Sequence, residues 1–252
     1  MDVNLKAMGK VRAHVRCDEC PIRHRAICSE CKSDELELLD QIKSYRTFEA
    51  GETIVWAGEE ADFVGSIVSG VAMLQRNMAD GRRQMVGLLL PSDFVGRPGR
   101  SIAPYDVVAA SQVVLCRFLR RRFESLIEEI PSLETRLLQM TLDELDAARE
   151  WMLLLGRKTA REKIASLLVI MAKRCTALGG GNSSGRLSFD LPLTREAMAD
   201  YLGLTIETVS RQMTSLRKAG LIELVGTRHV TIPNIALLLV EAGDDADGAM
   251  VV

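Results

Sequence analysis

The sequence has no long uninterrupted run of apolar residues, and this absence argues against a membrane-spanning chain. A transmembrane helix needs about 20 consecutive apolar residues, whereas apolar stretches here are short, as at 86–90. The first residues, Met-Asp-Val-Asn-Leu-Lys, contain neither an apolar core nor a small-residue cleavage site. We therefore expect no signal peptide and a cytoplasmic protein without a membrane partner.

Groups that commonly carry catalysis are also scarce. The chain has three histidines, His14, His24 and His229, which are scattered along it, and it has no glycine-rich phosphate-binding loop. Histidine is the most frequent general acid or base in enzymes. The sequence therefore gives no support to an enzyme, and no catalytic residue is assigned.

The composition is that of a folded protein. Apolar residues make up 47% of the 252 residues and charged residues 26%, which fits one large domain or two smaller ones. The net charge is −2, but residues 156–232 carry 12 Lys+Arg against 6 Asp+Glu. This basic block is a weak indication of a polyanionic partner, and an ordinary solvated surface explains it at least as well.

The six cysteines are placed unevenly. Four of them, Cys17, Cys20, Cys28 and Cys31, fall within fifteen residues, and the others are Cys116 and Cys175. In a small secreted protein such a cluster would indicate disulfide bonds. In a chain of this length without a leader it indicates metal or iron–sulfur ligation.

The first 120 residues change character twice. Residues 1–33 hold the cysteines and little that would form a core. Residues 34–42 predict a short helix with Leu36, Leu39 and Ile42 on one face and Ser33 or Asp34 as its N-cap. Residues 45–120 consist of short β-rich runs broken by Gly and Asp, including a hairpin signal at Asp80-Gly81. Such closely spaced strands predict a β-barrel or roll.

Residues 121–175 are predicted to be helical. Apolar and small residues follow a 3-4-3-4-3 spacing there, which is typical of a coiled-coil seam and favours a helix that pairs with its own copy. A helix that packs on its own domain is the alternative. The predicted dimer interface comprises Leu138, Thr141, Leu145, Ala148, Met152 and Leu155.

Residues 193–220 predict two helices joined by a tight turn. Thr194 begins the first helix, Gly203 permits the positive φ of the turn, and Thr205 caps the second helix, which runs to about Lys218. Ala199 is small where two helices cross closely. The second helix has Val209, Met213 and Leu216 on its inner face. This arrangement is a helix-turn-helix, whose second helix lies in the major groove of DNA.

The outer face of that second helix has the chemistry of base readout. Arg donates to guanine O6 and N7, Glu accepts from the cytosine amine, and Ser serves a base or a phosphate. Residues 221–232 predict a β-hairpin wing, on which Arg228 and His229 are positioned to contact phosphate. An exposed polar helix face is the alternative. The predicted DNA-binding residues are Thr205, Glu207, Thr208, Ser210, Arg211 and Arg228.

A β-roll, a long dimer-type helix and a winged helix-turn-helix with Glu207-x-x-Ser210-Arg211 resemble the Crp/Fnr family of bacterial transcription regulators. Three segments support the resemblance in order and spacing: Cys20-Pro-Ile-Arg-His-Arg-Ala-Ile-Cys28, Leu88-Leu-Leu-Pro-Ser-Asp-Phe94 and residues 141–163. The cysteines indicate the Fnr branch. The resemblance implies an α+β fold with an N-terminal β-roll of the cyclic-nucleotide-binding (jelly-roll) type, a long dimerisation helix and a C-terminal winged helix-turn-helix. The expected segments are a cysteine-rich arm (1–33), the β-roll (34–130), the dimerisation helix (131–158), the DNA-binding domain (159–235) and an acidic, disordered tail (236–252).

The resemblance further implies an oxygen sensor with a [4Fe–4S] cluster. Such regulators dimerise while the cluster is intact, bind double-stranded DNA at a TTGAT-N4-ATCAA-like inverted repeat and act on RNA polymerase. Cys17, Cys20 and Cys28 match the N-terminal ligands and Cys116 the distant one. The Cys-x7-Cys spacing is longer than in some members, so Cys31 is an alternative to Cys28. Cys175 is expected to be inert core.

Two other interpretations follow from the same residues. The family's cyclic-nucleotide branch needs an Arg-Ser or Arg-Thr pair with a glutamate; the stretch 94–103 has Arg100-Ser101 without an acidic partner, so no cyclic nucleotide is expected. The second interpretation is an effector- or redox-gated DNA-binding regulator whose cysteines bind zinc or form disulfides.

Overall fold

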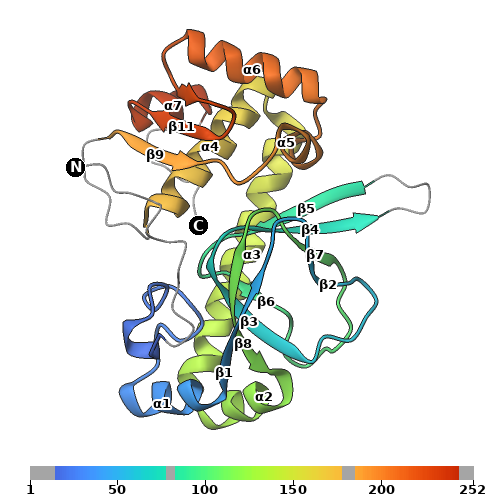
Figure 1. Cartoon of the computed structure of the whole chain (residues 1–252), viewed down its shortest axis with the longest axis vertical. Helices are drawn as coiled ribbons and strands as arrows, with labels where there is room; N and C mark the ends of the chain where they lie inside the picture. The colour runs from blue at the N-terminus through green and yellow to red at the C-terminus, as the bar shows by residue number, and fades with distance from the viewer. Residues whose placement is uncertain (1–14, 78–82, 178–184, 244–252) are drawn as a thin grey trace. The chain divides into compact units, whose positions relative to one another are not determined.

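The computed structural model describes residues 15–77, 83–177 and 185–243, without the side chains of residues 83 and 175–177. The chain divides into two compact units, residues 1–141 and 142–252, and Figure 1 labels most of their helices and strands. The boundary falls inside the long helix α3 (Pro131–Arg157). Within the described part of the chain, no helix is both long and apolar enough to cross a membrane.

Two four-stranded antiparallel sheets form most of the first unit. Their strand orders are β1-β8-β3-β6 and β2-β7-β4-β5. This is the β-roll that the closely spaced strands predict. The strands are β1 (Lys43–Phe48), β2 (Thr53–Val55), β3 (Phe63–Ser69), β4 (Ala72–Asn77), β5 (Arg83–Leu89), β6 (Phe94–Val95), β7 (Asp106–Ala109) and β8 (Val113–Leu119).

The hydrophobic core of the roll draws side chains from both sheets. Phe48, Ile67 and Leu115 come from the first sheet, and Val107 and Ala109 come from the second; all are buried. β4 and β5 pair as the predicted antiparallel hairpin, and its Asp80-Gly81 turn lies outside the described residues. The sequence did not indicate β1, because its segment Lys-Ser-Tyr-Arg-Thr-Phe lacks an apolar alternation and lies at a sheet edge.

The cysteine-rich arm is more compact than its sequence indicates. It forms a 3₁₀ turn (Cys17–Glu19) and further turns, in which Ile22, Ala26 and Ile27 are at most 2% exposed. The expectation that residues 1–33 contribute little core is therefore wrong for this segment. These three residues are separated by polar ones, so no regular hydrophobic period marks them.

Helix α1 (Ser33–Ile42) follows the arm and buries Leu36 and Leu39. The predicted N-cap is wrong, because the cap position is Lys32 rather than Ser33 or Asp34. The carboxylate of Glu35 accepts a hydrogen bond from the Lys32 backbone N–H at 2.7 Å. This contact satisfies an otherwise free amide at the helix start and lets the helix begin one residue earlier.

Helix α2 (Arg120–Glu129) closes one end of the roll and leads into α3. Its Phe123 is fully buried and packs against Phe118 of β8 and Phe94 of β6, with ring centroids 5.2 and 5.6 Å apart. Pro131 is the first residue of α3. A backbone N–H at this position makes no hydrogen bond within the helix, so proline, which lacks the N–H, is tolerated there.

The second unit is a winged helix-turn-helix. Helix α4 (Ala160–Ala177) packs against α6 (Ile206–Lys218) and α7 (Ile235–Glu241), and α5 (Arg195–Leu202) packs against α6. The predicted wing strands β10 (Glu223–Val225) and β11 (His229–Ile232) are antiparallel, and β9 (Leu187–Asp190), which was not predicted, joins β11 as a third strand.

Part of the predicted disordered tail is helical. Helix α7 begins after Asn234, whose side chain accepts a hydrogen bond from the Ala236 N–H at 3.0 Å. Leu238 of this helix is fully buried, in an element that packs against α4. The apolar face of α7 outweighs the nearby acidic composition, and only residues 244–252 of the expected tail lie outside the described residues.

Candidate cysteine site and nucleic-acid interface

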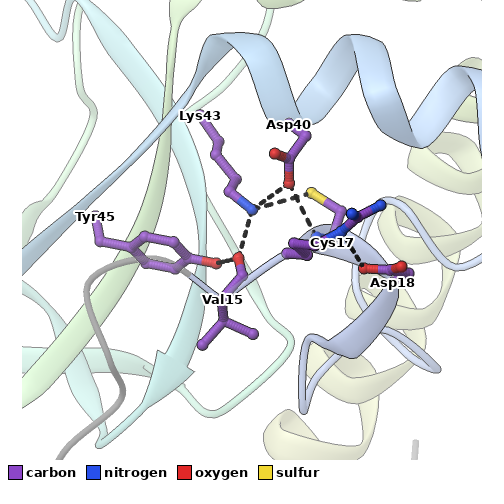
Figure 2. A network of polar contacts seen from close by, with 7 residues as sticks. Val15, Cys17, Asp18, Asp40, Lys43 and Tyr45 are labelled. Atoms are coloured by element: carbon purple, nitrogen blue, oxygen red, sulfur yellow. Dashed lines mark hydrogen bonds and ion pairs between the residues drawn. The ribbon is translucent and has the colours of Figure 1, made fainter.

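A network of polar contacts fixes the beginning of the cysteine arm (Figure 2). The Lys43 ammonium donates to the Val15 carbonyl oxygen at 2.5 Å, to the Cys17 sulfur at 3.6 Å and to the Asp40 carboxylate. Asp40 also accepts the Cys17 backbone N–H at 3.0 Å, and the Tyr45 hydroxyl donates to Val15 at 3.4 Å. Residues from α1 and β1 thus hold Cys17 in place.

The electrostatics of this network keep the Lys43 ammonium charged. Burial alone would lower the pKa of Lys43, but the Asp40 hydrogen bond and the charge of Cys17 outweigh it and raise the pKa. Burial raises the pKa of the Cys17 thiol to about 12, although the positive charge of Lys43 opposes that rise. The protein therefore offers Cys17 a buried cation that favours its thiolate form.

Arg23, within the loop between Cys20 and Cys28, bonds to the backbone that follows the loop. The Arg23 guanidinium donates to the Ser29 carbonyl oxygen at 2.5 Å and to the Cys31 carbonyl oxygen at 2.7 Å. Burial raises the pKa of Cys28 to about 11; the neighbouring Cys20 thiol raises it and Arg23 lowers it. Arg23 therefore fastens the loop that carries Cys20 and Cys28 to the residues that follow it.

Cys116 stands on the roll, in the middle of β8. It pairs in register with Tyr45 of β1 and Ser66 of β3. A side chain at Gly65 would overlap the Cys116 carbonyl, so glycine lets β3 lie close to β8 at this point. Burial raises the pKa of the Cys116 thiol. The strand provides a rigid, buried position for this sulfur.

Tyr45 links the beginning of the cysteine arm to the strand pair that carries Cys116: it pairs with Cys116 across β1 and β8, and its hydroxyl donates to the Val15 carbonyl oxygen. After burial, the largest influences that raise the Cys116 pKa are the thiols of Cys20, Cys17 and Cys28. Lys43 and Tyr45 of β1 contact the beginning of the arm, so the arm meets the sheet one strand away from Cys116. Nearly one hundred residues of sequence separate these two segments.

Cys31 has a different direct neighbour. Its sulfur lies 3.9 Å from the Ser132 hydroxyl oxygen of α3; burial raises the Cys31 pKa, and this contact lowers it by a smaller amount. This engagement of Cys31 with α3 agrees with the prediction of Cys28 as the third arm ligand. Cys175 lies in α4, and its side chain is outside the described part of the structure.

The candidate site is rich in thiols, which are donors that both zinc ions and iron–sulfur clusters take. Among the described residues, no group of three or more His, Cys, Asp or Glu side chains is placed to hold one metal ion. Four thiolates on one zinc lie roughly 4 Å apart, whereas a [4Fe–4S] cluster takes its thiolates at separate iron atoms. The hydroxyls of Ser29, next to Cys28, and Ser66, opposite Cys116, are buried without a hydrogen-bond partner in the structure. They are available as donors to a group held here.

The helix-turn-helix follows the sequence signals closely. Thr194 accepts the Ala197 N–H at 3.1 Å, and Thr205 accepts the Thr208 N–H at 3.2 Å, so both predicted caps are confirmed. Gly203 has the predicted positive φ, 63°. Ala199 is buried, and Val209, Met213 and Leu216 form the buried face of α6. The two helices are thereby fixed at a close crossing.

The opposite face of α6 is exposed. Glu207, Ser210 and Arg211 are accessible, while Thr208 is half-buried and bonded to the Thr205 hydroxyl at 3.1 Å. Hydrogen bonds from its own backbone N–H and from Thr205 hold the pKa of Glu207 below its usual range. Glu207 is therefore an anionic acceptor at the start of the helix that the sequence predicts to enter the groove.

Two contacts define the surroundings of this helix. Arg161 of α4 forms a two-point ion pair with Glu241 of α7, at 2.5 and 3.1 Å, and also donates to Ser215 of α6 at 2.7 Å. On the wing, Arg228 is exposed, whereas the His229 ring is held by Asp190 at 2.8 Å. Of the two predicted phosphate contacts, Arg228 is thus the freer side chain.

The apolar row on α3 is exposed, as a dimer interface requires. Leu138 is 60% exposed, Leu145 46% and Met152 65%; Thr141 and Ala148 are also exposed and Leu155 is half-buried. Large apolar side chains in a continuous exposed row indicate a surface that another molecule covers.

Comparisons with known proteins agree with this architecture. Residues 45–130 match the model of the cyclic nucleotide-binding domain, and residues 162–240 match that of the Crp-like helix-turn-helix domain. The chain is 61% identical to the transcriptional activator protein FnrL of Cereibacter sphaeroides, over 93% of this chain and 95% of that protein. It is 30% identical to the transcriptional activator protein Anr of Pseudomonas aeruginosa, over 93% and 96%.

A solved structure gives the same result. The structure of FixK2 from Bradyrhizobium japonicum matches with a TM-score of 0.71 and 30% identity, over 81% of this chain and 98% of that one. The likeness therefore extends over the β-roll and the helix-turn-helix together.

Proposed function

Because the chain belongs to the Crp/Fnr family of transcription regulators, we propose that it is an oxygen-responsive transcriptional regulator. It binds a TTGAT-N4-ATCAA-like palindrome as a homodimer while a [4Fe–4S] cluster is intact, and it acts on RNA polymerase at the promoter. The observation that carries the proposal is a buried Cys116 whose neighbouring strand β1 holds the start of the cysteine arm through Lys43 and Tyr45, in a chain with a helix-turn-helix. The relatives named above as transcriptional activators support an activating role.

The proposed ligands come from two parts of the first unit. Cys17, Cys20 and Cys28 come from the arm, and Cys116 comes from the centre of a buried sheet. When bound, the cluster would supply an oxygen-labile bridge between the two. The residues of the chain set its surroundings: Lys43 balances negative charge beside Cys17, and burial of Cys116 limits the access of water.

The partner of the exposed row on α3 is proposed to be a second copy of the chain. The row is apolar, follows a coiled-coil spacing and has acidic residues beside it at Asp143, Glu144 and Asp146. Pairing two copies brings like charges near one another, which leaves the dimer marginally stable. A marginal dimer suits a switch, because a ligand event of a few kcal/mol then decides its population.

DNA recognition is assigned to the exposed face of α6. Glu207, Ser210 and Arg211 are positioned to read base edges, Thr205 and Thr208 lie at the helix start, and Arg228 on the wing contacts phosphate. No cyclic nucleotide is included in the proposal, because the stretch 94–103 lacks the acidic partner that would hold the sugar.

A colourless regulator gated by zinc or by disulfides is the competing function. Anaerobic purification separates the two, since about four iron and four sulfide per chain are expected for the cluster. Gel-shift binding to the palindrome, measured before and after exposure to air, tests the switch. We expect tight binding only before exposure. A colourless protein with stoichiometric zinc, or DNA binding unaffected by air, would contradict the proposal.

A further inference from the structure

The loop that carries Cys20 and Cys28 is bonded to helix α3 by one arginine. Arg136 donates through Nη2 to the carbonyl oxygen of Arg25 at 2.6 Å and through Nε to that of Ala26 at 3.4 Å. The two carbonyls belong to consecutive residues between the two cysteines. A guanidinium spans both because its donors form a rigid planar fork.

A second contact joins the arm to the preceding turn of the same helix. The Ser132 hydroxyl donates to the Glu35 carboxylate at 3.0 Å and contacts the Cys31 sulfur at 3.9 Å. Ser132 and Arg136 are four residues apart, so they lie on one face of α3. The arm therefore meets this face at two successive turns.

The exposed row begins next to these contacts. Leu138, its first member, is two residues beyond Arg136 and is 60% exposed. Helix α3 is continuous from Pro131 to Arg157, so a shift or rotation at Arg136 is passed to Leu138 and Thr141. The arm and the start of the proposed dimer face thus share one rigid segment.

We propose that Arg136 is the positioning residue that couples the cysteine loop to the dimer face of α3. The inference rests on the proposed function. With Cys20 and Cys28 ligated, the loop presents the carbonyls of Arg25 and Ala26 to the guanidinium and fixes α3 for pairing. When the ligands are released, the loop relaxes, the two hydrogen bonds are lost and α3 is freed. Arg136 touches no proposed ligand and acts only through the loop.

The test compares cluster content with dimer affinity in Arg136→Met. Iron and sulfide per chain are measured anaerobically, and dimer dissociation constants are measured by sedimentation before and after exposure to air. In the wild-type protein we expect air to weaken the dimer about tenfold or more, as an allosteric coupling of ordinary size does. In Arg136→Met we expect near-normal iron but a dimer affinity that air no longer changes.

Two further variants complete the experiment. Arg136→Lys keeps the charge but lacks the fork, so we expect a partial response to air. Arg122→Met makes the same substitution at an exposed position of α2 and is expected to behave as wild type. Arg136→Met that loads iron and still dimerises in an air-dependent way would overturn the inference. Loss of iron in both Arg136 variants would also overturn it, because Arg136 would then only support ligation. Absence of iron from the wild-type protein would instead contradict the proposed function.

Discussion

The ammonium nitrogen of Lys43 lies 3.6 Å from the sulfur of Cys17, and the Lys43 side chain is only 8% exposed. The same ammonium contacts Asp40 and the Val15 carbonyl. One buried cation therefore attaches the start of the cysteine arm to the end of α1 and to β1. The position of Cys17 depends on a residue 26 positions later in the sequence.

Replacing Lys43 is expected to release this part of the arm. Lys43→Met keeps the aliphatic volume but removes the donor, and hydrogen bonds to charged groups contribute about 1.5–3 kcal/mol each. We expect amide hydrogen exchange near Cys17 to become roughly ten- to a hundredfold faster. The control is Arg16→Gln, which breaks an ion pair with Asp18 whose side chains are 71% and 56% exposed. Equal exchange rates in Lys43→Met and wild type would show that Lys43 does not hold the arm.

The identity of the third arm ligand is tested by serine substitutions. Because Cys28 is the predicted third ligand and Cys31 contacts Ser132, Cys28→Ser is expected to abolish iron binding and Cys31→Ser to leave most of it. Cys116→Ser is expected to be as severe as Cys20→Ser, since a cluster that loses one of its four thiolates is open to solvent. Iron and sulfide analysis of anaerobic protein is the measurement.

A control variant and the outcome that would contradict the assignment complete that series. Cys175→Ser is the control and is expected to retain full iron content. If Cys31→Ser eliminates the cluster while Cys28→Ser does not, the assignment of Cys28 is incorrect and Cys31 is the ligand.

Local signals were sufficient for the helix-turn-helix. Thr194, Gly203 and Thr205 act within three or four residues of the groups that they cap or turn, so their roles are visible in sequence. The cluster of Cys17, Cys20, Cys28 and Cys31 was also visible in the sequence, because its density and residue type indicate ligation before any fold is known. The resemblance to a known family supplied the pairing of Cys116 with the arm.

The contacts that support the site were not identifiable. Lys43 and Cys17 meet only when β1 lies beside the arm, and β1 itself has no apolar alternation. Arg136 and Arg25 are 111 residues apart. A lysine or arginine in sequence looks the same whether it is solvated or buried against backbone carbonyls, so only tertiary structure reveals these roles.

The dimer interface is tested by Ala148→Asp. Ala148 is exposed on α3, and a symmetric dimer would bury two added carboxylates there beside existing acids. An unpaired charge at an interface weakens association by about 2 kcal/mol or more, which is roughly 30-fold in dissociation constant. We expect monomers by anaerobic sedimentation at concentrations where wild type is dimeric. Ser125→Asp, on exposed α2 surface, is the control. An undiminished Ala148→Asp dimer would place the interface elsewhere.

Base readout by α6 is tested with three alanine variants. Arg211→Ala is expected to relax the preference for a guanine in each half-site, and Glu207→Ala to relax it where a cytosine amine is presented. Each lost contact should reduce discrimination by about 1–3 kcal/mol. Arg228→Ala is expected to weaken binding to all sequences alike and to flatten the salt dependence, because a wing residue that contacts phosphate carries no sequence information.

The measurement is anaerobic binding to a panel of single-base variants of the palindrome at two salt concentrations. Each half-site belongs to one subunit, so a variant homodimer should lose specificity at both halves equally. Arg228→Ala serves as the matched control, since it removes the same charge as Arg211→Ala from a different exposed position. If Arg211→Ala keeps its full base preference and only binds every sequence more weakly, then Arg211 contacts phosphate. The sequence would then be read by other residues or through the shape of the DNA.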